Sequence, residues 1–149
     1  MEHPKDIGDR STLAIILALK EAGYQVLLPF GENTRYDLAI EANGSLQRVQ
    51  CKTGRLSRGA VLFRTSSSYY HHPTPSPPAK HYRGQVDFFG VYCRETSGVY
   101  LIPIADLPDW QAGLRIDPPR NNQRRRIRFA ADYEIGRVVT AVPLSPSGA

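Results

Sequence analysis

The segment YDLAIEANGSLQRVQCK, residues 36–52, predicts a β-hairpin. Its Asn43-Gly44 pair is typical of a two-residue type I′ turn, in which both central residues have positive φ. Such a turn places Asp37 opposite Gln50 on the neighbouring strand, with their Cβ atoms about 5 Å apart. Because side chains alternate along a strand, Lys52 shares a face with Gln50. The opposite face is apolar and collects Leu38, Ile40, Val49 and Cys51.

The hairpin therefore predicts an acid, an amide and a lysine together on one face of a sheet whose other face belongs to the core. Two interpretations stay open from the hairpin alone. In the first interpretation, the three side chains form a site that holds a divalent metal ion and a phosphate. In the second, Asp37 and Lys52 are a structural, hydrogen-bonded pair at the edge of the sheet.

The length and composition fit one globular domain, since the chain has 149 residues and 41% of them are hydrophobic. We expect this domain to span residues 1–142 and residues 143–149 to form a frayed tail. No apolar run approaches the ~18 residues that a membrane span requires, and the first residues lack the layout of a signal peptide. Cys51 and Cys93 lie in apolar strand patterns without metal-ligand spacing, which favours reduced core residues and a cytoplasmic location.

Periodicity and turn residues predict the remaining elements. A helix occupies residues 11–22, with Asp9 or Ser11 as its N-terminal cap. The segments that follow are a buried strand at 25–29, a turn within 53–59, a strand at 60–65, an irregular loop at 66–80, paired strands at 87–94 and 99–104, a short helix within 106–110, and one or two short strands within 114–135. This order is typical of an α+β fold with a mixed sheet.

The formal net charge is +5, which favours a polyanionic partner. The arginines form two clusters, one beside the hairpin and one in the C-terminal part: Arg48, Arg55, Arg58 and Arg64, then Arg115, Arg120, Arg124, Arg125, Arg126 and Arg128. Solvated surface charge is the alternative. The place of the first cluster beside the hairpin favours contacts with phosphates.

Asp37 followed by Gln50-Cys51-Lys52 resembles the catalytic motif of the PD-(D/E)XK nuclease superfamily, with Gln50 at the (D/E) position. The resemblance covers roughly residues 8–135 and is carried by further segments at 8–11, 28–33, 35–38, 48–54, 82–87 and 121–123. These segments are similar to prokaryotic endonucleases of the superfamily, including intron-encoded homing endonucleases and relatives of archaeal Holliday-junction resolvases.

The resemblance implies an α+β fold with a restriction-endonuclease-like αβββαβ core, in which helices flank a mixed central sheet. It implies that Asp37, Gln50 and Lys52 are catalytic. Mg²⁺ or Mn²⁺ would be held by Asp37, the side-chain oxygen of Gln50 and the backbone carbonyl of Cys51. Lys52 would orient or deprotonate the attacking water and stabilise the charge of the transition state.

The first helix departs from the family pattern. Relatives usually carry a glutamate there as a further metal ligand, and the corresponding residue in this chain is Thr12. Asp9 lies three residues earlier on the same helical face and is either a substitute for that glutamate or a simple cap. Because Thr12 and Gln50 both lack a negative charge, we expect weaker metal binding than in relatives with carboxylates at these positions.

Contacts with DNA are expected from basic and amide side chains beside the hairpin and in the C-terminal part, with a solvated surface or a plain turn as the alternative. These residues are Arg35, Arg48, Arg55, Arg64, Arg83, Arg120, Asn122, Gln123, Arg124 and Arg125.

Three functions follow from this sequence. The leading hypothesis is a metal-dependent DNA endonuclease of homing or junction-resolving type, acting in the prokaryotic cytosol or nucleoid on double-stranded or branched DNA. It would be a homodimer or homotetramer, since two strands are cut and one domain carries one site. The second is a DNA-binding module that has lost catalysis, favoured by Thr12 and Gln50. The third is a protein-interaction domain without affinity for DNA.

Overall fold

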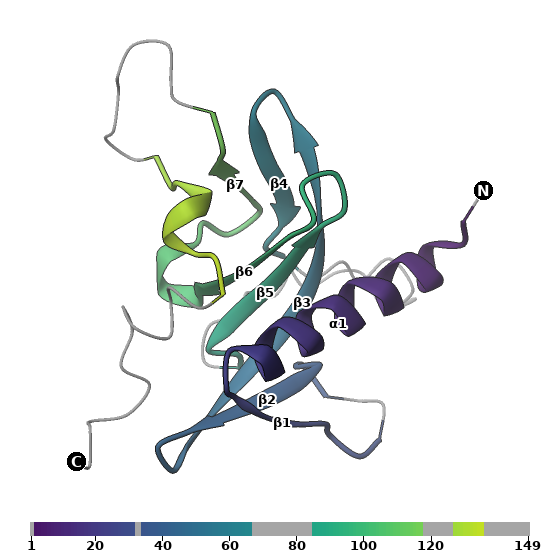
Figure 1. The fold of residues 1–149 in the computed structure, drawn as a ribbon, viewed down its shortest axis with the longest axis vertical. Coiled ribbons are helices and arrows are strands. Elements are labelled where there is room, and N and C mark those ends of the chain that lie inside the picture. Colours follow the sequence, from purple (N-terminus) through teal and green to yellow (C-terminus); the bar gives the residue numbers. More distant parts are fainter. Residues whose placement is uncertain (1, 32–33, 67–84, 118–126, 136–149) are drawn as a thin grey trace, which may run out of the picture.

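The computed structural model describes residues 2–31, 34–66, 85–117 and 127–135. Its elements in chain order are α1 (Pro4–Glu21), β1 (Gln25–Leu27), β2 (Leu38–Ala42), β3 (Ser45–Ser57), β4 (Ala60–Arg64), β5 (Phe88–Cys93), β6 (Gly98–Pro103), the 3-10 helix η1 (Ile104–Asp106), β7 (Gln111–Arg115) and the 3-10 helix η2 (Ala130–Asp132) (Figure 1). Within the described residues, no helix is long and apolar enough to cross a membrane.

Strand β3 is the centre of the sheet and pairs with three other strands. It pairs antiparallel with β2 over residues 45–49, parallel with β5 over 49–54, and antiparallel with β4 over 55–57. Val49 has both Leu38 and Phe88 as partners, so β2 and β5 lie on opposite edges of β3. The outer pairs β1–β2, β4–β7 and β5–β6 are all antiparallel. The parallel β3–β5 pair confirms the predicted mixed sheet.

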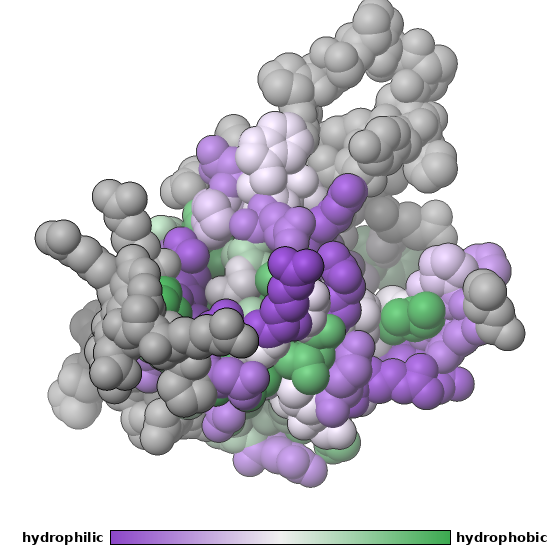
Figure 2. Space-filling model, turned by 90° about the horizontal axis from the view of Figure 1, so that it is seen from above, coloured by the Kyte–Doolittle hydropathy of each residue, from purple (hydrophilic) through white to green (hydrophobic). Residues whose placement is uncertain are grey.

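Two apolar cores form, one on each face of the central strands. Helix α1 covers one face (Figure 1) and buries Ile15 and Leu19 against Leu38, Ile40 and Val49. The other face packs against β4 and β7, in a core that includes Val61, Phe63, Phe89, Val91 and Leu114. The predicted apolar face of the hairpin is therefore confirmed, with Cys51 half-buried at its margin. Figure 2 shows a mostly hydrophilic surface with small apolar patches on the face seen there.

The hairpin turn forms as predicted. Asn43 and Gly44 have φ values of 53° and 81°, as a type I′ turn requires, and Ala42 pairs with Ser45. A second turn of this kind lies at Arg58-Gly59, with φ values of 51° and 78°. The predicted turn within 53–59 was therefore too long, because β3 continues through Gly54 to Ser57.

The helix begins earlier than the sequence pattern predicted. The N-cap is His3, whose side chain accepts a hydrogen bond from the Lys5 N–H, and Pro4 occupies the first turn. Asp9 and Ser11 therefore lie inside α1, and the prediction that either is the cap was wrong. Ser11 is buried instead, with its hydroxyl 2.6 Å from that of Thr53 on β3.

Two other predicted segments differ from the structure. The strand at 25–29 is the short β1, which lies at the edge of the sheet and is mostly exposed, so the prediction of a buried strand was wrong. The helix expected within 106–110 is instead η1, which ends at Asp106. Most of the predicted loop at 66–80, part of the 114–135 segment and all of the tail at 143–149 lie outside the described residues. The predicted αβββαβ order places a second helix between β4 and β5. This helix would fall within residues 67–84, which also lie outside the described residues.

Candidate active site

Asp37 lies at the point where the chain enters β2. Its backbone N–H donates to the Val49 carbonyl at 2.9 Å, and its Oδ2 accepts the Cys51 N–H at 2.8 Å. The β2–β3 ladder begins at Leu38, so Asp37 is not the ladder partner of Gln50 that the turn geometry predicted. The carboxylate instead takes the N–H one residue further along β3, beyond the end of the ladder.

The backbone of Cys51 faces the same edge of β3 as Asp37. In an extended strand the N–H and C=O of one residue point to the same side. Because the Cys51 N–H points to the Asp37 carboxylate, the Cys51 carbonyl also lies on the Asp37 edge. The thiol lies within hydrogen-bonding reach of Thr12 on α1, and burial, with a smaller contribution from Asp37, raises its pKa to about 12. Thr12 is therefore close to the motif, and its hydroxyl donates to the Gly8 carbonyl at 3.1 Å.

Lys52 is half-buried on the opposite face of β3 from Cys51. Its Nζ lies 5.6 Å from the centre of the Phe89 ring on β5. Burial lowers the pKa of Lys52 below its ordinary value, the Asp37 carboxylate opposes this effect, and the charges of Arg35 and Arg64 reinforce it. A lysine in this setting gives up its proton more readily than one in water, as a general base must.

The Asp37 carboxylate responds to the same surroundings in the opposite sense. Partial burial raises the pKa of Asp37 above its ordinary value, while the Cys51 N–H and the Lys52 ammonium act to lower it. Desolvation is thus the largest effect on both members of the Asp37–Lys52 pair.

These groups fit a hard divalent cation. Asp37 supplies a carboxylate, and the Cys51 carbonyl lies on the same edge of β3. Gln50, the residue before Cys51, supplies a half-buried side-chain amide. Oxygen ligands of this kind suit Mg²⁺, which keeps several waters and needs only one or two carboxylates. Among the described residues, no three His, Cys, Asp or Glu side chains are grouped so that they could hold a metal ion together, so the protein would supply mainly neutral oxygens beside Asp37.

Four predicted DNA-binding arginines fall within the described residues. Arg35 and Arg64 act on Lys52 through their charge and so lie near it. Arg48 forms an ion pair with Asp87, at 3.2 Å between Nε and Oδ2. Arg55 is exposed on β3. The other predicted contacts, Arg83, Arg120, Asn122, Gln123, Arg124 and Arg125, lie outside the described residues.

Sequence reasoning assigned no role to two residues that contact the predicted site residues. Phe89 lies under the Lys52 amine, and Gln85 accepts a hydrogen bond from Arg35 Nε. Phe89 is part of an apolar strand pattern that indicates only burial. Gln85 is far from Arg35 in the chain, and only the parallel pairing of β5 with β3 brings them together. Asp9, the predicted substitute ligand, is an exposed residue inside α1.

Comparison with known proteins gives one family. A family model described as PD-(D/E)XK endonuclease matches residues 2–136, which include Asp37, Gln50 and Lys52. A solved structure of the bacterial homing endonuclease I-Ssp6803I is similar, with a TM-score of 0.73 and 22% sequence identity, and the match covers 95% of this chain and 99% of that one. No curated protein matches the chain. The predicted restriction-endonuclease-like fold is confirmed, and the chain belongs to the PD-(D/E)XK endonuclease family.

Proposed function

We propose that this protein is a metal-dependent DNA endonuclease of homing or junction-resolving type, which hydrolyses phosphodiester bonds. The observation that carries the proposal is the contact between the start of β2 and the middle of β3. There the Asp37 carboxylate accepts a hydrogen bond from the Cys51 N–H, and the next residue, Lys52, carries a half-buried amine. The family membership supports hydrolysis, and the likeness to a homing endonuclease favours that type.

Each residue of the site has a distinct part in this proposal. Asp37, the Gln50 side chain and the Cys51 carbonyl would hold Mg²⁺ or Mn²⁺, which when bound polarises the phosphoryl group and lowers the pKa of water. Lys52 accepts a proton from the attacking water and, once protonated, stabilises negative charge on the phosphorus oxygens. The charges of Arg35 and Arg64 favour the neutral amine before attack and attract the DNA phosphate.

Cleavage of supercoiled plasmid and of a synthetic four-way junction tests this function. Wild type is compared with Asp37→Ala and Lys52→Ala, each with Mg²⁺, with Mn²⁺ and with chelator, and Glu41→Ala at an exposed position of β2 is the matched control. We expect metal-dependent cleavage by wild type and the control, and a loss of about 100-fold or more in both site variants. Preferred cutting of the linear duplex supports a homing enzyme, and preferred cutting of the junction supports a resolvase.

A catalytically impaired DNA-binding module is the second candidate, favoured by the position of Thr12. Its hydroxyl lies beside the Cys51 thiol, so a longer acidic side chain at this position would extend toward the Asp37 edge. Under this candidate, wild type binds DNA but does not cut it, and Thr12→Glu restores metal-dependent cutting. Leu46→Glu adds the same charge at an exposed position of β3, near the hairpin turn, and is the control. Active wild-type protein whose rate is unaffected by Thr12→Glu would exclude this candidate.

A further inference from the structure

A hydrogen bond crosses the strand that carries the motif. Arg35 Nε donates to Gln85 Oε1. Arg35 precedes β2 and Gln85 precedes β5, and these two strands lie on opposite edges of β3. The bond therefore joins the two segments that enter the sheet on either side of β3, near Gln50 and Lys52.

The Gln85 end of this bond is rigidly held. The next residue, Val86, is 1% exposed and belongs to the same core as Phe89. Asp87 follows, and its N–H donates to the Arg48 carbonyl at 2.9 Å while its Oδ2 accepts the Arg48 N–H at 2.8 Å. Its carbonyl accepts the Ile104 N–H at 3.0 Å. Gln85 is thus anchored, within two residues, by two backbone–backbone hydrogen bonds, one bond from a backbone N–H to the Asp87 carboxylate, and a buried side chain.

The Arg35 end is a long side chain that needs such an anchor. A long, flexible arginine side chain loses much conformational freedom when it is held in one position. Tyr36 beside it packs against the same core as Val86, so both ends of the bond lie on the Lys52 face of β3. The charge of Arg35 contributes to the lowered pKa of Lys52, in keeping with a guanidinium on the same side of the sheet as the amine.

We propose that Gln85 is a positioning residue of the cleavage site, which fixes the guanidinium of Arg35 beside Lys52 so that it meets the DNA phosphate already ordered. This inference rests on the proposed function, since the phosphate is that of the bound DNA. A bond to Nε sets the plane of a guanidinium, and a planar group aligned in advance binds a phosphate with less loss of freedom. Gln85 itself does not touch the substrate.

DNA binding measured in a double-mutant cycle tests the proposal. The variants are Arg35→Ala, Gln85→Leu and the double variant, each with chelator present so that cleavage does not contribute. Leucine matches glutamine in size but lacks the acceptor. The matched control is Gln47→Leu, which removes a half-buried glutamine of β3 whose amide bonds to Ser45. Gln85→Asn, which keeps an amide, is the second variant in case leucine impairs folding.

We expect Arg35→Ala to weaken binding and to reduce the salt slope by about one phosphate contact. Gln85→Leu weakens binding by a smaller factor, and the double variant binds no more weakly than Arg35→Ala. The Nε–H signal of Arg35 in NMR spectra exchanges faster with solvent in Gln85→Leu. Losses that add independently in the double variant, or an unchanged affinity in both Gln85 variants, would show that Gln85 only joins two segments of the fold.

Failure of the proposed function gives a different result. If wild type binds DNA but does not cut it under any metal condition, the endonuclease proposal fails while the binding cycle still decides the role of Gln85. If wild type does not bind DNA at all, both proposals are overturned.

Discussion

Lys52 lies where burial and positive charge both favour its neutral form. Arg64 contributes from β4, and its charge lowers the pKa of Lys52 while Asp37 raises it. The rate of a reaction that needs a neutral amine rises with pH until that amine has lost its proton. The rising limb of the pH–rate profile therefore reports the pKa of Lys52.

Removal of the Arg64 charge is expected to shift this profile. In Arg64→Gln the pKa of Lys52 rises, because one repulsive charge is gone, and the midpoint of the rate profile moves to higher pH. Arg55→Gln removes an equal charge from the exposed part of β3 and is the control. Single-turnover cleavage at saturating DNA across pH gives the midpoint. A shift to lower pH, or the same shift in both variants, would contradict the assignment of Lys52 as the base.

The buried thiol of Cys51 is expected to make the stability of the fold depend on alkaline pH. Burial raises the pKa of its thiol from the unfolded value of 9.0 to about 12. A raised folded-state pKa contributes stability below the unfolded pKa, and this contribution is lost as pH rises toward the folded value. We expect the free energy of unfolding to fall between pH 9 and about 12, and to fall less steeply in Cys51→Ala. Urea unfolding at a series of pH values measures both slopes, and equal slopes would contradict the burial of the thiol.

At the scale of elements, two glycines of this chain are expected to respond to alanine in opposite directions. Gly8 lies inside α1, and a Cβ there would meet nothing within 4 Å. Gly8→Ala should stabilise the protein by about 0.5–1 kcal/mol, because alanine favours the helix. Gly44 has a φ of 81° in the hairpin turn, so Gly44→Ala should destabilise it by about 1–2 kcal/mol. Thermal unfolding of both variants gives the signs, and a stabilising Gly44→Ala would exclude the type I′ turn.

Local patterns predicted the hairpin well because its turn and its alternation depend on neighbouring residues alone. Asn43-Gly44 fixed the register of Leu38 and Val49, and the register brought Lys52 near Asp37. The helix start was missed because the cap signal of His3 and Pro4 competed with Asp9 and Ser11.

The extent of β3 and the Arg35–Gln85 bond depend on tertiary packing, which no local pattern contains. Gly54 resembles a turn residue in sequence, but a Cβ at this position would lie 2.6 Å from Val61 Cγ1. Close packing against β4 therefore accounts for the glycine within a continuous strand. The Arg35–Gln85 bond, in turn, requires the parallel pairing of β5 with β3.

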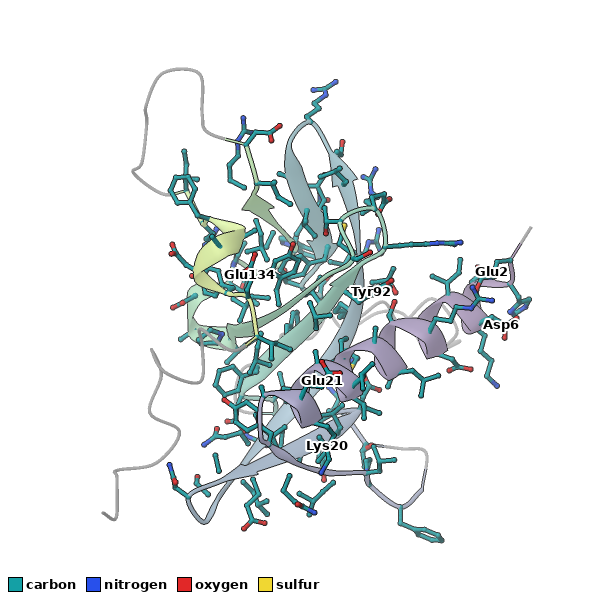
Figure 3. All side chains as sticks on the ribbon, in the orientation of Figure 1. Glu2, Asp6, Lys20, Glu21, Tyr92 and Glu134 are labelled. Carbon is teal, nitrogen blue, oxygen red and sulfur yellow. The ribbon has the colours of Figure 1, made fainter. Side chains whose placement is uncertain are left out.

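At the scale of the whole molecule, the exposed face of α1 carries an unusual apolar pair. Leu13 and Leu17 lie one helical turn apart and are 65% and 60% exposed. Asp6 lies toward one end of the helix, and Lys20 and Glu21 lie toward the other (Figure 3). Two copies of α1 packed antiparallel, with Leu13 against its own counterpart, place Asp6 opposite Lys20 of the second copy. The same register places Lys5 opposite Glu21. This face is thus complementary to itself, as a two-fold interface requires.

A second copy of the chain on this face would supply the second active site that a double-strand cut needs. We expect Leu13→Glu combined with Leu17→Glu to give a monomer, because two new carboxylates would meet at the two-fold axis and two more would face Asp9 of the other copy, with no apolar area to offset the repulsion. Leu28→Glu changes a side chain that is 66% exposed outside the helix and is the control.

Sedimentation gives the assembly state, and plasmid assays separate nicked from linear product. The monomer should still nick supercoiled DNA through Asp37 and Lys52 but should no longer produce linear DNA in a single binding event. An assembly that survives the double substitution would place the interface elsewhere on the molecule, whereas a wild-type monomer that makes linear DNA would remove the need for a second copy.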